Sequence, residues 1–244
     1  MLDEGLNHVG AFEICRALEG AEADVAVRQP HQHRRPGGRR LVAARQRLAG
    51  LDQGEGAAGR DALGLQHGGG QDFADALVAG PLGYAARFPI LITPTARLSA
   101  QTRTTLQGLG IKRVIVPGGT SAVSTSVENE IKALGITVQR FGGQVRSETA
   151  TLVAAYAYDS LDFDRSHVDL ARGDQFPDTL TGGPHAGVEH APILLTATPN
   201  SLGTATEAFL RNRGVALRDG HVFGGTAAVS TATEEAAERA AATR

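Results

Sequence analysis

Residues that could do chemistry lie in loops that recur along this chain. Two glycine pairs, Gly118–Gly119 and Gly224–Gly225, each follow an apolar run and precede a helical stretch. Glycines let a backbone approach a ligand closely, and a helix N-terminus attracts an anion, so a phosphate or carboxylate seat is one interpretation. We favour a tight strand-to-helix turn instead, because the loops lack both the Lys-Ser/Thr of a nucleotide P-loop and GxGxxG spacing.

Paired aspartates form a second candidate site. Asp72 and Asp75 share one loop, and Asp174 and Asp178 share the corresponding loop later in the chain. Two carboxylates in a loop could bind a cation or act as acid and base. Because no third ligand lies nearby in sequence and the pair recurs, we favour a structural role near helix starts. No metal and no cofactor is therefore expected.

Nucleophilic catalysis has little support in the sequence. Ser124 and Ser230 follow the glycine pairs but lack the GxSxG pattern of a nucleophile elbow. A duplicated catalytic site would need a histidine in both copies, and none is shared. The histidines of the later copy, which we expect to be exposed or at helix edges, are His167, His185, His190 and His221. We assign no catalytic residue.

Three arginines are the best candidates for ligand binding. Arg140 and Arg146 flank a Phe-Gly-Gly turn, and Arg172 follows the next expected strand. The carboxyl ends of parallel strands are where open α/β sheets bind ligands, and a guanidinium matches carboxylate or phosphate groups. The competing interpretation is that these arginines form ion pairs with nearby acidic residues, namely Glu148, Asp174 and Asp178.

A duplicated segment positions these residues. Residues 72–135 and 175–240 share ordered motifs, and the glycine pairs correspond at a slightly larger offset than the rest. At one constant offset, the motif residues Asp75, Pro89, Ile90 and Leu91 correspond to Asp178, Pro192, Ile193 and Leu194, with Leu195 next. A duplication of this length indicates one structural unit that is used at least twice.

Apolar β-rich runs alternate with helical stretches from residue 71 onward. Thr125 with Glu128, and Thr231 with Glu234, have the spacing of a capping box. Strands are expected at 89–93, 112–116, 137–141, 167–171, 192–196 and 221–223, and helices at 76–87, 99–109, 125–134, 147–160, 178–188, 202–213 and 231–242. This alternation predicts an α/β fold of repeated βα units, with parallel sheets flanked by helices in Rossmann-like layers.

Composition divides the chain into three regions. Residues 1–70 are atypical, rich in Arg, Gln, His and Gly without strand runs, and are expected to be disordered or non-native sequence apart from a helix within 8–28. A basic tail that contacts a polyanion is the functional alternative. Residues 71–135 form a partial repeat, and residues 136–244 form a complete one.

The totals exclude several classes of protein. The 244 residues carry a net charge of −2, which leaves no basic footprint for nucleic acid. The single cysteine, Cys15, excludes an internal disulfide, and the chain has no Trp for stacking on sugars. No apolar run approaches the roughly 18 residues of a membrane span, and no secretory signal is visible.

Several motifs resemble a known family in their order. VRSETA, ARGDQFPDTLTGG, APILLT and FGGTAAVS, together with FADALVAGPL, FPILIT and VPGGTSAVS, resemble the cell-wall-binding repeat type 2 family over about residues 71–244. The family's Arg-Gly-Arg-Thr-Ala pattern is represented by Arg140, Gly143, Arg146, Thr149 and Ala150. Val145 and Ser147 depart from that pattern, where the family has Asp or Asn and an aromatic residue.

The resemblance implies an extracellular protein of the cell wall or cell surface in Gram-positive-type bacteria. Family members use tandem copies that pack against one another to bind anionic wall polysaccharide or teichoic-acid-like polymer without covalent attachment. The resemblance therefore implies a non-catalytic anchoring module, in which the Pro-Ile-Leu motif supports the unit and its contacts. Two alternatives stay open, a fragment of an amidase-type wall hydrolase and a self-assembling surface-layer component.

Overall fold

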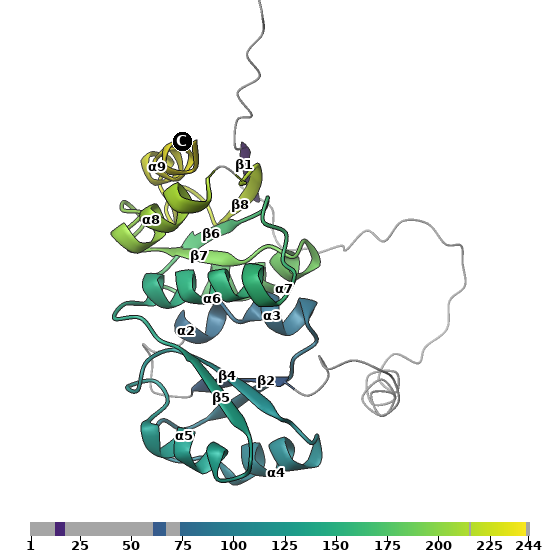
Figure 1. The fold of residues 1–244 in the computed structure, drawn as a ribbon. Helices are drawn as coiled ribbons and strands as arrows, with labels where there is room; N and C mark the ends of the chain where they lie inside the picture. The colour runs from purple at the N-terminus through teal and green to yellow at the C-terminus, as the bar shows by residue number, and fades with distance from the viewer. Residues whose placement is uncertain (1–12, 18–60, 67–73, 215, 243–244) are drawn as a thin grey trace, which may run out of the picture. The chain divides into compact units, whose positions relative to one another are not determined.

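The computed structural model describes residues 13–17, 61–66, 74–214 and 216–242. Its elements alternate between strands and helices, as the sequence predicts, and the strands form two four-stranded sheets (Figure 1). No helix in this part of the chain combines the length and the apolarity that a membrane crossing requires.

All neighbouring strands in both sheets are parallel. The first sheet runs in the order β3 (Ile90–Thr93), β2 (Asp61–Gln66), β4 (Arg113–Pro117) and β5 (Thr137–Phe141). The second runs in the order β7 (Ile193–Thr196), β6 (Asp169–Arg172), β8 (Asp219–Phe223) and β1 (Glu13–Ala17). The two orders correspond strand for strand, so the duplication in sequence is a duplication in topology.

Hydrogen bonds repeat along with the topology. The hydroxyl of Thr102 donates to the carbonyl of Ile92, and the hydroxyl of Thr206 donates to the carbonyl of Leu195, both at 2.6 Å. Each bond ties a helix to the strand that precedes it. The two copies therefore use equivalent polar contacts inside equivalent βα units.

The strands show two corrections to the predicted organisation. Glu13–Ala17 and Asp61–Gln66 are strands, so the expectations that residues 1–70 lack strands and that a helix covers 13–17 are wrong. Both strands gain their hydrogen bonds from distant partners, which local composition does not reveal. In addition, β5 pairs with β4 of the first sheet, and β1 takes the corresponding edge of the second. The division at residues 70 and 135 stays a prediction.

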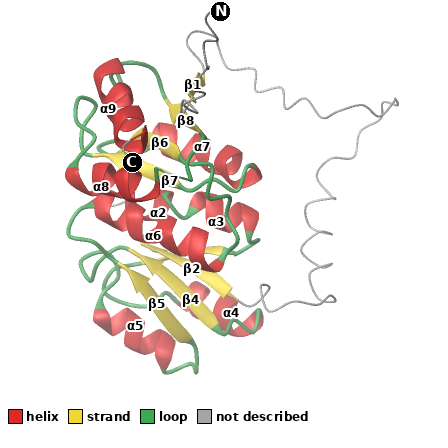
Figure 2. Cartoon of the chain, turned by 45° about the horizontal axis from the view of Figure 1, so that its top comes forward, coloured by secondary structure: helices red, strands yellow, loops and turns green. Residues whose placement is uncertain are grey.

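Eight helices connect or follow these strands in the described residues. They are α2 (Ala74–Leu77), α3 (Gly80–Ala85), α4 (Ala100–Gly108), α5 (Thr125–Lys132), α6 (Arg146–Ser160), α7 (Pro177–Val188), α8 (Thr204–Arg213) and α9 (Thr231–Ala242) (Figure 2). The helix expected over 76–87 is thus divided into α2 and α3.

The capping residues of α5 and α9 differ from the prediction. Ser124 caps α5 by accepting a hydrogen bond from the backbone N–H of Val127, and Ser230 accepts from Thr233 in the same way. The predicted capping box at Thr125 is therefore wrong by one residue. Since Glu128 is not needed at the cap, its carboxylate is available for another partner.

Alternate residues of each strand face different cores. In β4, Val114 and Val116 pack with α4 and α5, whereas Ile115 faces a central core. In the second sheet, Leu194 packs with α8 and α9, whereas Ile193 faces the same central core. This period of two explains why β4 and β7 are almost entirely apolar, because both faces of these strands are buried.

The central core belongs to both copies. Its members come from both sheets and from α3, α6 and α7. Helix α6 buries residues on several faces, including Ala150, Val153, Tyr156 and Tyr158, because it packs against elements of both copies. A helix in such a position cannot show the single apolar stripe of a surface helix.

Glycines allow α3 and α7 to approach each other closely. Gly80 and Gly183 hold equivalent positions in the two copies, and a β-carbon at Gly80 would lie 3.3 Å from the Cα of Gly183. A β-carbon at Gly187 would lie 2.6 Å from the Cβ of Tyr84. These helices therefore pack backbone against backbone, which fixes how the two copies meet.

We expect Gly187→Ala to destabilise the fold by about 1–3 kcal/mol, because the added methyl overlaps the backbone-proximal Cβ of Tyr84 and forces α3 and α7 apart. The matched control is Gly108→Ala at the end of α4, where a β-carbon meets nothing within 4 Å and the change should be neutral or stabilising. Chemical denaturation measures both. Equal free energies of unfolding for the two variants would contradict the close packing of α3 on α7.

Candidate functional site

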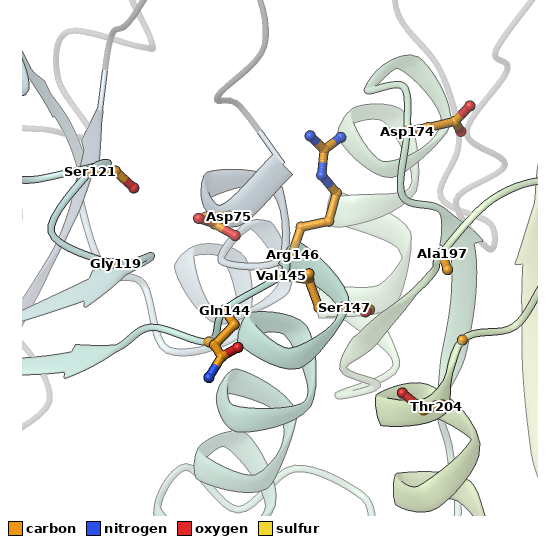
Figure 3. Close-up of a pocket in the computed structure, with 12 residues that line it drawn as sticks. Asp75, Gly119, Ser121, Gln144, Val145, Arg146, Ser147, Asp174, Ala197 and Thr204 are labelled. Atoms are coloured by element: carbon orange, nitrogen blue, oxygen red, sulfur yellow. The ribbon is translucent and has the colours of Figure 1, made fainter.

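A cleft of about 610 Å³ lies where loops of the two copies meet (Figure 3). Its lining comes from loops that follow β4, β5, β6 and β7, so it lies at the carboxyl ends of strands from both sheets. This is the end at which open α/β sheets bind ligands. The lining residues are Asp75, Gly119, Ser121, Gly143, Gln144, Val145, Arg146, Ser147, Asp174, Ala197, Gly203 and Thr204.

Arg146 is the predicted arginine that lines this cleft. It is the first residue of α6, and its Nη1 donates a hydrogen bond to the carbonyl of Gly173 at 2.6 Å. Figure 3 shows its side chain extending from the start of α6 between Asp75 of α2 and Asp174, which follows β6. The guanidinium is thus held at the joint between the copies.

The start of α6 also faces the cleft. The backbone N–H of Gln144 donates to the Glu148 carboxylate at 2.7 Å, and that of Gly143 donates to the Thr149 hydroxyl at 3.1 Å. A side chain at Gly143 is excluded, since its β-carbon would lie 2.5 Å from the Cβ of Glu148. These contacts fix the loop, and the helix dipole adds a partial positive charge beside Arg146.

Arg172 is engaged in a bidentate ion pair. Its Nε and Nη2 donate to the two carboxylate oxygens of Asp174 at 2.8 and 2.7 Å. The Arg172 guanidinium holds the pKa of Asp174 below its usual value. Arg172 therefore follows the competing interpretation, in which it forms an ion pair with Asp174. Asp174 of this pair lines one wall of the cleft.

Arg140 braces the first glycine pair and does not line the cleft. Its guanidinium donates to Glu128 at 3.0 and 2.8 Å and to the carbonyls of Gly118, Gly119 and Val123. Glu128 lies far away in sequence from the acidic residues expected as partners, so sequence alone could not identify it. The structure thus separates three arginines that looked alike into a brace, an ion pair and a cleft residue.

The recurring aspartates contact the recurring glycines. Gly118 and Gly224 have φ values of +98° and +100°, which only glycine adopts without strain. A β-carbon at Gly118 would lie 2.8 Å from Oδ2 of Asp75, and one at Gly224 would lie 2.7 Å from Oδ2 of Asp178. Each glycine pair therefore accommodates a carboxylate of its own copy. Of the four glycines in these pairs, Gly119 lines the cleft and Gly225 does not.

The Pro-Ile-Leu motif differs in burial between the copies. Pro192, Ile193, Leu194 and Leu195 are buried, with Leu194 in the core of α8 and α9 and the neighbouring residues in the central core. In the first copy, Pro89 and Leu91 are half-buried, while Ile90 is 43% exposed. None of these residues lines the cleft. The motif contributes to packing at the sheet rather than to the cleft surface.

Two histidines, His167 and His221, depart from the predicted location. His167 forms a β-bridge with Asp219, and its side chain is 27% exposed. His221 lies in β8 with its side chain 19% exposed, hydrogen bonded to Asp169, so the expectation of an exposed or helix-edge histidine is wrong for it. Sequence reasoning missed this because Asp169 and His221 lie on different strands of the second sheet.

Comparison with known proteins gives the family. The model of the cell wall binding domain 2 (CWB2) family matches residues 39–128 and 140–234, which is more than half of the chain. The chain belongs to the cell wall binding domain 2 family. The match begins upstream of residue 71, so the resemblance that the sequence motifs gave over about residues 71–244 extends to residues 39–70. A location at the cell wall or cell surface follows from the family.

Two relatives come from Bacillus subtilis (strain 168). N-acetylmuramoyl-L-alanine amidase LytC is 35% identical over 162 residues, which are 66% of this chain and 31% of LytC. The amidase enhancer is 30% identical over 166 residues, which are 68% of this chain and 21% of that protein. The chain thus spans less than a third of either relative, and the similarity concerns only that part.

Two solved structures from Clostridium difficile share the fold. Cwp6 aligns with a TM-score of 0.64 and 25% identity, over 74% of this chain and 27% of Cwp6. Cwp8 aligns with a TM-score of 0.60 and 24% identity, over 73% of this chain and 29% of Cwp8. The aligned part of Cwp6 and of Cwp8, less than a third of each, therefore shares the α/β architecture of parallel sheets and helices with this chain.

We expect Glu128→Gln to lower the free energy of unfolding at pH 7 by about 1–3 kcal/mol, because the carboxylate accepts charge-assisted hydrogen bonds from Arg140 and Lys132. Those partners hold the pKa of Glu128 below its ordinary 4.5. Its stabilisation is therefore complete above that value and lost as pH falls through the lower pKa of the folded state, so the variant and the parent should converge in acid.

The control for this pH series is Glu207→Gln, which breaks an exposed pair with Arg211 on α8 and should change stability by less than about 0.5 kcal/mol. Denaturant titrations at several pH values measure all three proteins. A Glu128→Gln penalty that does not change between pH 7 and strong acid would contradict the role given to this carboxylate.

Proposed function

We propose that this chain is a non-catalytic module that anchors a surface or secreted protein to an anionic polymer of the cell wall. The observation that carries the proposal is the position of Arg146 at the start of α6, inside the cleft that the two copies form at their strand ends. A guanidinium beside a helix N-terminus suits a phosphate or carboxylate group.

The rest of the lining suits a polymer that also carries hydroxyl groups. Ser121, Gln144 and Thr204 offer hydroxyl and amide groups, and these can donate to or accept from sugar or polyol hydroxyls. Each carboxylate oxygen of Asp174 accepts a hydrogen bond from Arg172, so its charge is compensated within the protein. We infer that one anionic group lies against Arg146 while neighbouring hydroxyls contact the polar rim.

Tandem copies support binding to a repeating ligand. A polymer presents the same group many times, so linked sites gain affinity through effective concentration even where each site is weak. The second expected partner is another copy of the repeat. The close approach of Gly80 and Gly183, where the two copies of this chain pack on each other, supports this expectation. In this proposal the module supplies attachment, and any catalytic activity belongs to other domains.

We expect Arg146→Ala to weaken binding to isolated cell walls by about 10-fold or more, because one charge-assisted contact is lost. Arg146→Lys keeps the charge but loses the planar fork, and should give an intermediate affinity. The measurement is cosedimentation of the purified chain with walls at low salt, with thermal unfolding to show that each variant is folded.

Arg211→Ala is the matched control, since Arg211 is exposed on α8 and pairs only with its neighbour Glu207 in the described contacts. Equal dissociation constants for Arg146→Ala and Arg211→Ala would contradict the cleft as the binding site. Release of soluble wall fragments by the chain would instead favour the amidase-type alternative, and assembly of the chain without any wall would favour the surface-layer alternative.

A further inference from the structure

A cluster of metal-ligand side chains lies within the second copy, away from the cleft. Asp169 of β6, His185 of α7 and His221 of β8 each offer one ligand atom, and these atoms all lie within 4.8 Å of one another. Asp169 begins β6, whereas the cleft residue Asp174 follows that strand. The cluster is therefore a separate site on the sheet.

The carboxylate of Asp169 is fully buried, and only one of its two oxygens accepts a hydrogen bond among the described residues. Its Oδ1 accepts a hydrogen bond from the backbone N–H of His221 at 2.9 Å and lies 3.2 Å from the ring Nδ1 of that residue. Its Oδ2 is buried without a hydrogen-bond partner among the described residues. A buried carboxylate oxygen without a partner is unfavourable, and a cation bound to this oxygen would remove that cost.

The first copy shows what the fold requires at these positions. Register places Asp169 opposite Ile193 and Leu63 opposite the equivalent Ile90, so residues 169 and 63 correspond. The offsets of the repeat likewise place Ile115 at the position of His221 and Leu82 at that of His185. Ile115 and Leu82 are fully buried core residues. The second copy thus replaces three apolar residues with three metal-ligand residues, one aspartate and two histidines, which packing alone does not demand.

A fourth donor and a route to solvent are present. The Glu189 carboxylate lies 3.7 Å from Nδ1 of His221 and 3.9 Å from Nε2 of His185, and the corresponding residue of the first copy is Ala86. His185 is about half exposed, so a hydrated ion can reach it.

We infer that Asp169, His185 and His221, with Glu189 as the fourth ligand, form a binding site for a divalent transition metal, with zinc as the best match. Two imidazoles and two carboxylates are ligands that zinc accepts at about 2.0–2.2 Å in tetrahedral geometry. The ligand atoms must then approach to about 3.4 Å from one another, which rotation of the half-exposed His185 side chain allows. The metal would join β6, β8 and α7.

The test is zinc titration of the full chain after dialysis against EDTA, followed by calorimetry and by thermal unfolding with and without zinc. The parent chain should bind about one zinc ion at this site and unfold at a higher temperature with zinc present. The triple variant Asp169→Leu, His185→Leu, His221→Ile installs the residues of the first copy. It should remain folded, lose this zinc ion, and lose the zinc-dependent rise in Tm.

Two single variants keep the test decisive if the triple variant fails to fold. His185→Leu changes a half-exposed residue and should weaken zinc binding by at least about 10-fold. His190→Asn is the control, because His190 is exposed, has φ +52°, where Asn is tolerated, and lies outside the cluster. Unchanged zinc affinity in His185→Leu, or zinc held only by other histidines such as His31 and His33, would overturn the inference.

Discussion

Strands β4 and β7 bury both of their faces, and this requirement is a constraint on how the two copies pack. Helices α4 and α5 cover one face of the first sheet, and α8 and α9 cover one face of the second. The remaining faces meet a central core that contains residues of both sheets and of α3, α6 and α7. Neither copy can exclude water from its second face alone, so the repeats stabilise each other. The close approach at Gly80 and Gly183 serves this constraint, because it lets α3 and α7 pack tightly in the core that both copies share.

The candidate binding site is a consequence of the same packing. Because α6 follows β5 of the first sheet and packs against the second, its first residues lie where the strand ends of both copies meet. Arg146 is placed there by the topology and donates to the carbonyl of Gly173, while Arg140 braces a turn and Arg172 forms an ion pair. Duplication therefore does more than repeat one site. The cleft where the two copies meet is lined by residues of both, and a single copy would lack it. The Asp169 cluster shows that the copies have also diverged inside their sheets.

Much of the fold could be predicted from sequence, and the errors have physical causes. Apolar runs and the glycines after helices placed most elements of residues 89–242 to within a few residues, because these features are local. Strands β1 and β2 were missed because their pairing partners lie far away in sequence and their residues carry no strand pattern. The three arginines could not be told apart, since what distinguishes Arg140 is a distant partner, Glu128, and the carbonyls of a folded turn. The sequence likewise shows that Asp75 and Gly118 recur in the second copy, but it does not show that the two residues lie against each other.

In the proposed function, the two packed repeats bind an anionic wall polymer where they meet. The most direct measurement is the binding isotherm of the purified chain on isolated walls, before and after hydrofluoric acid removes polymers attached through phosphodiester bonds. We expect saturable binding to intact walls that is largely lost from the stripped peptidoglycan. Equal binding to both preparations, or no binding to intact walls at low salt, would contradict it.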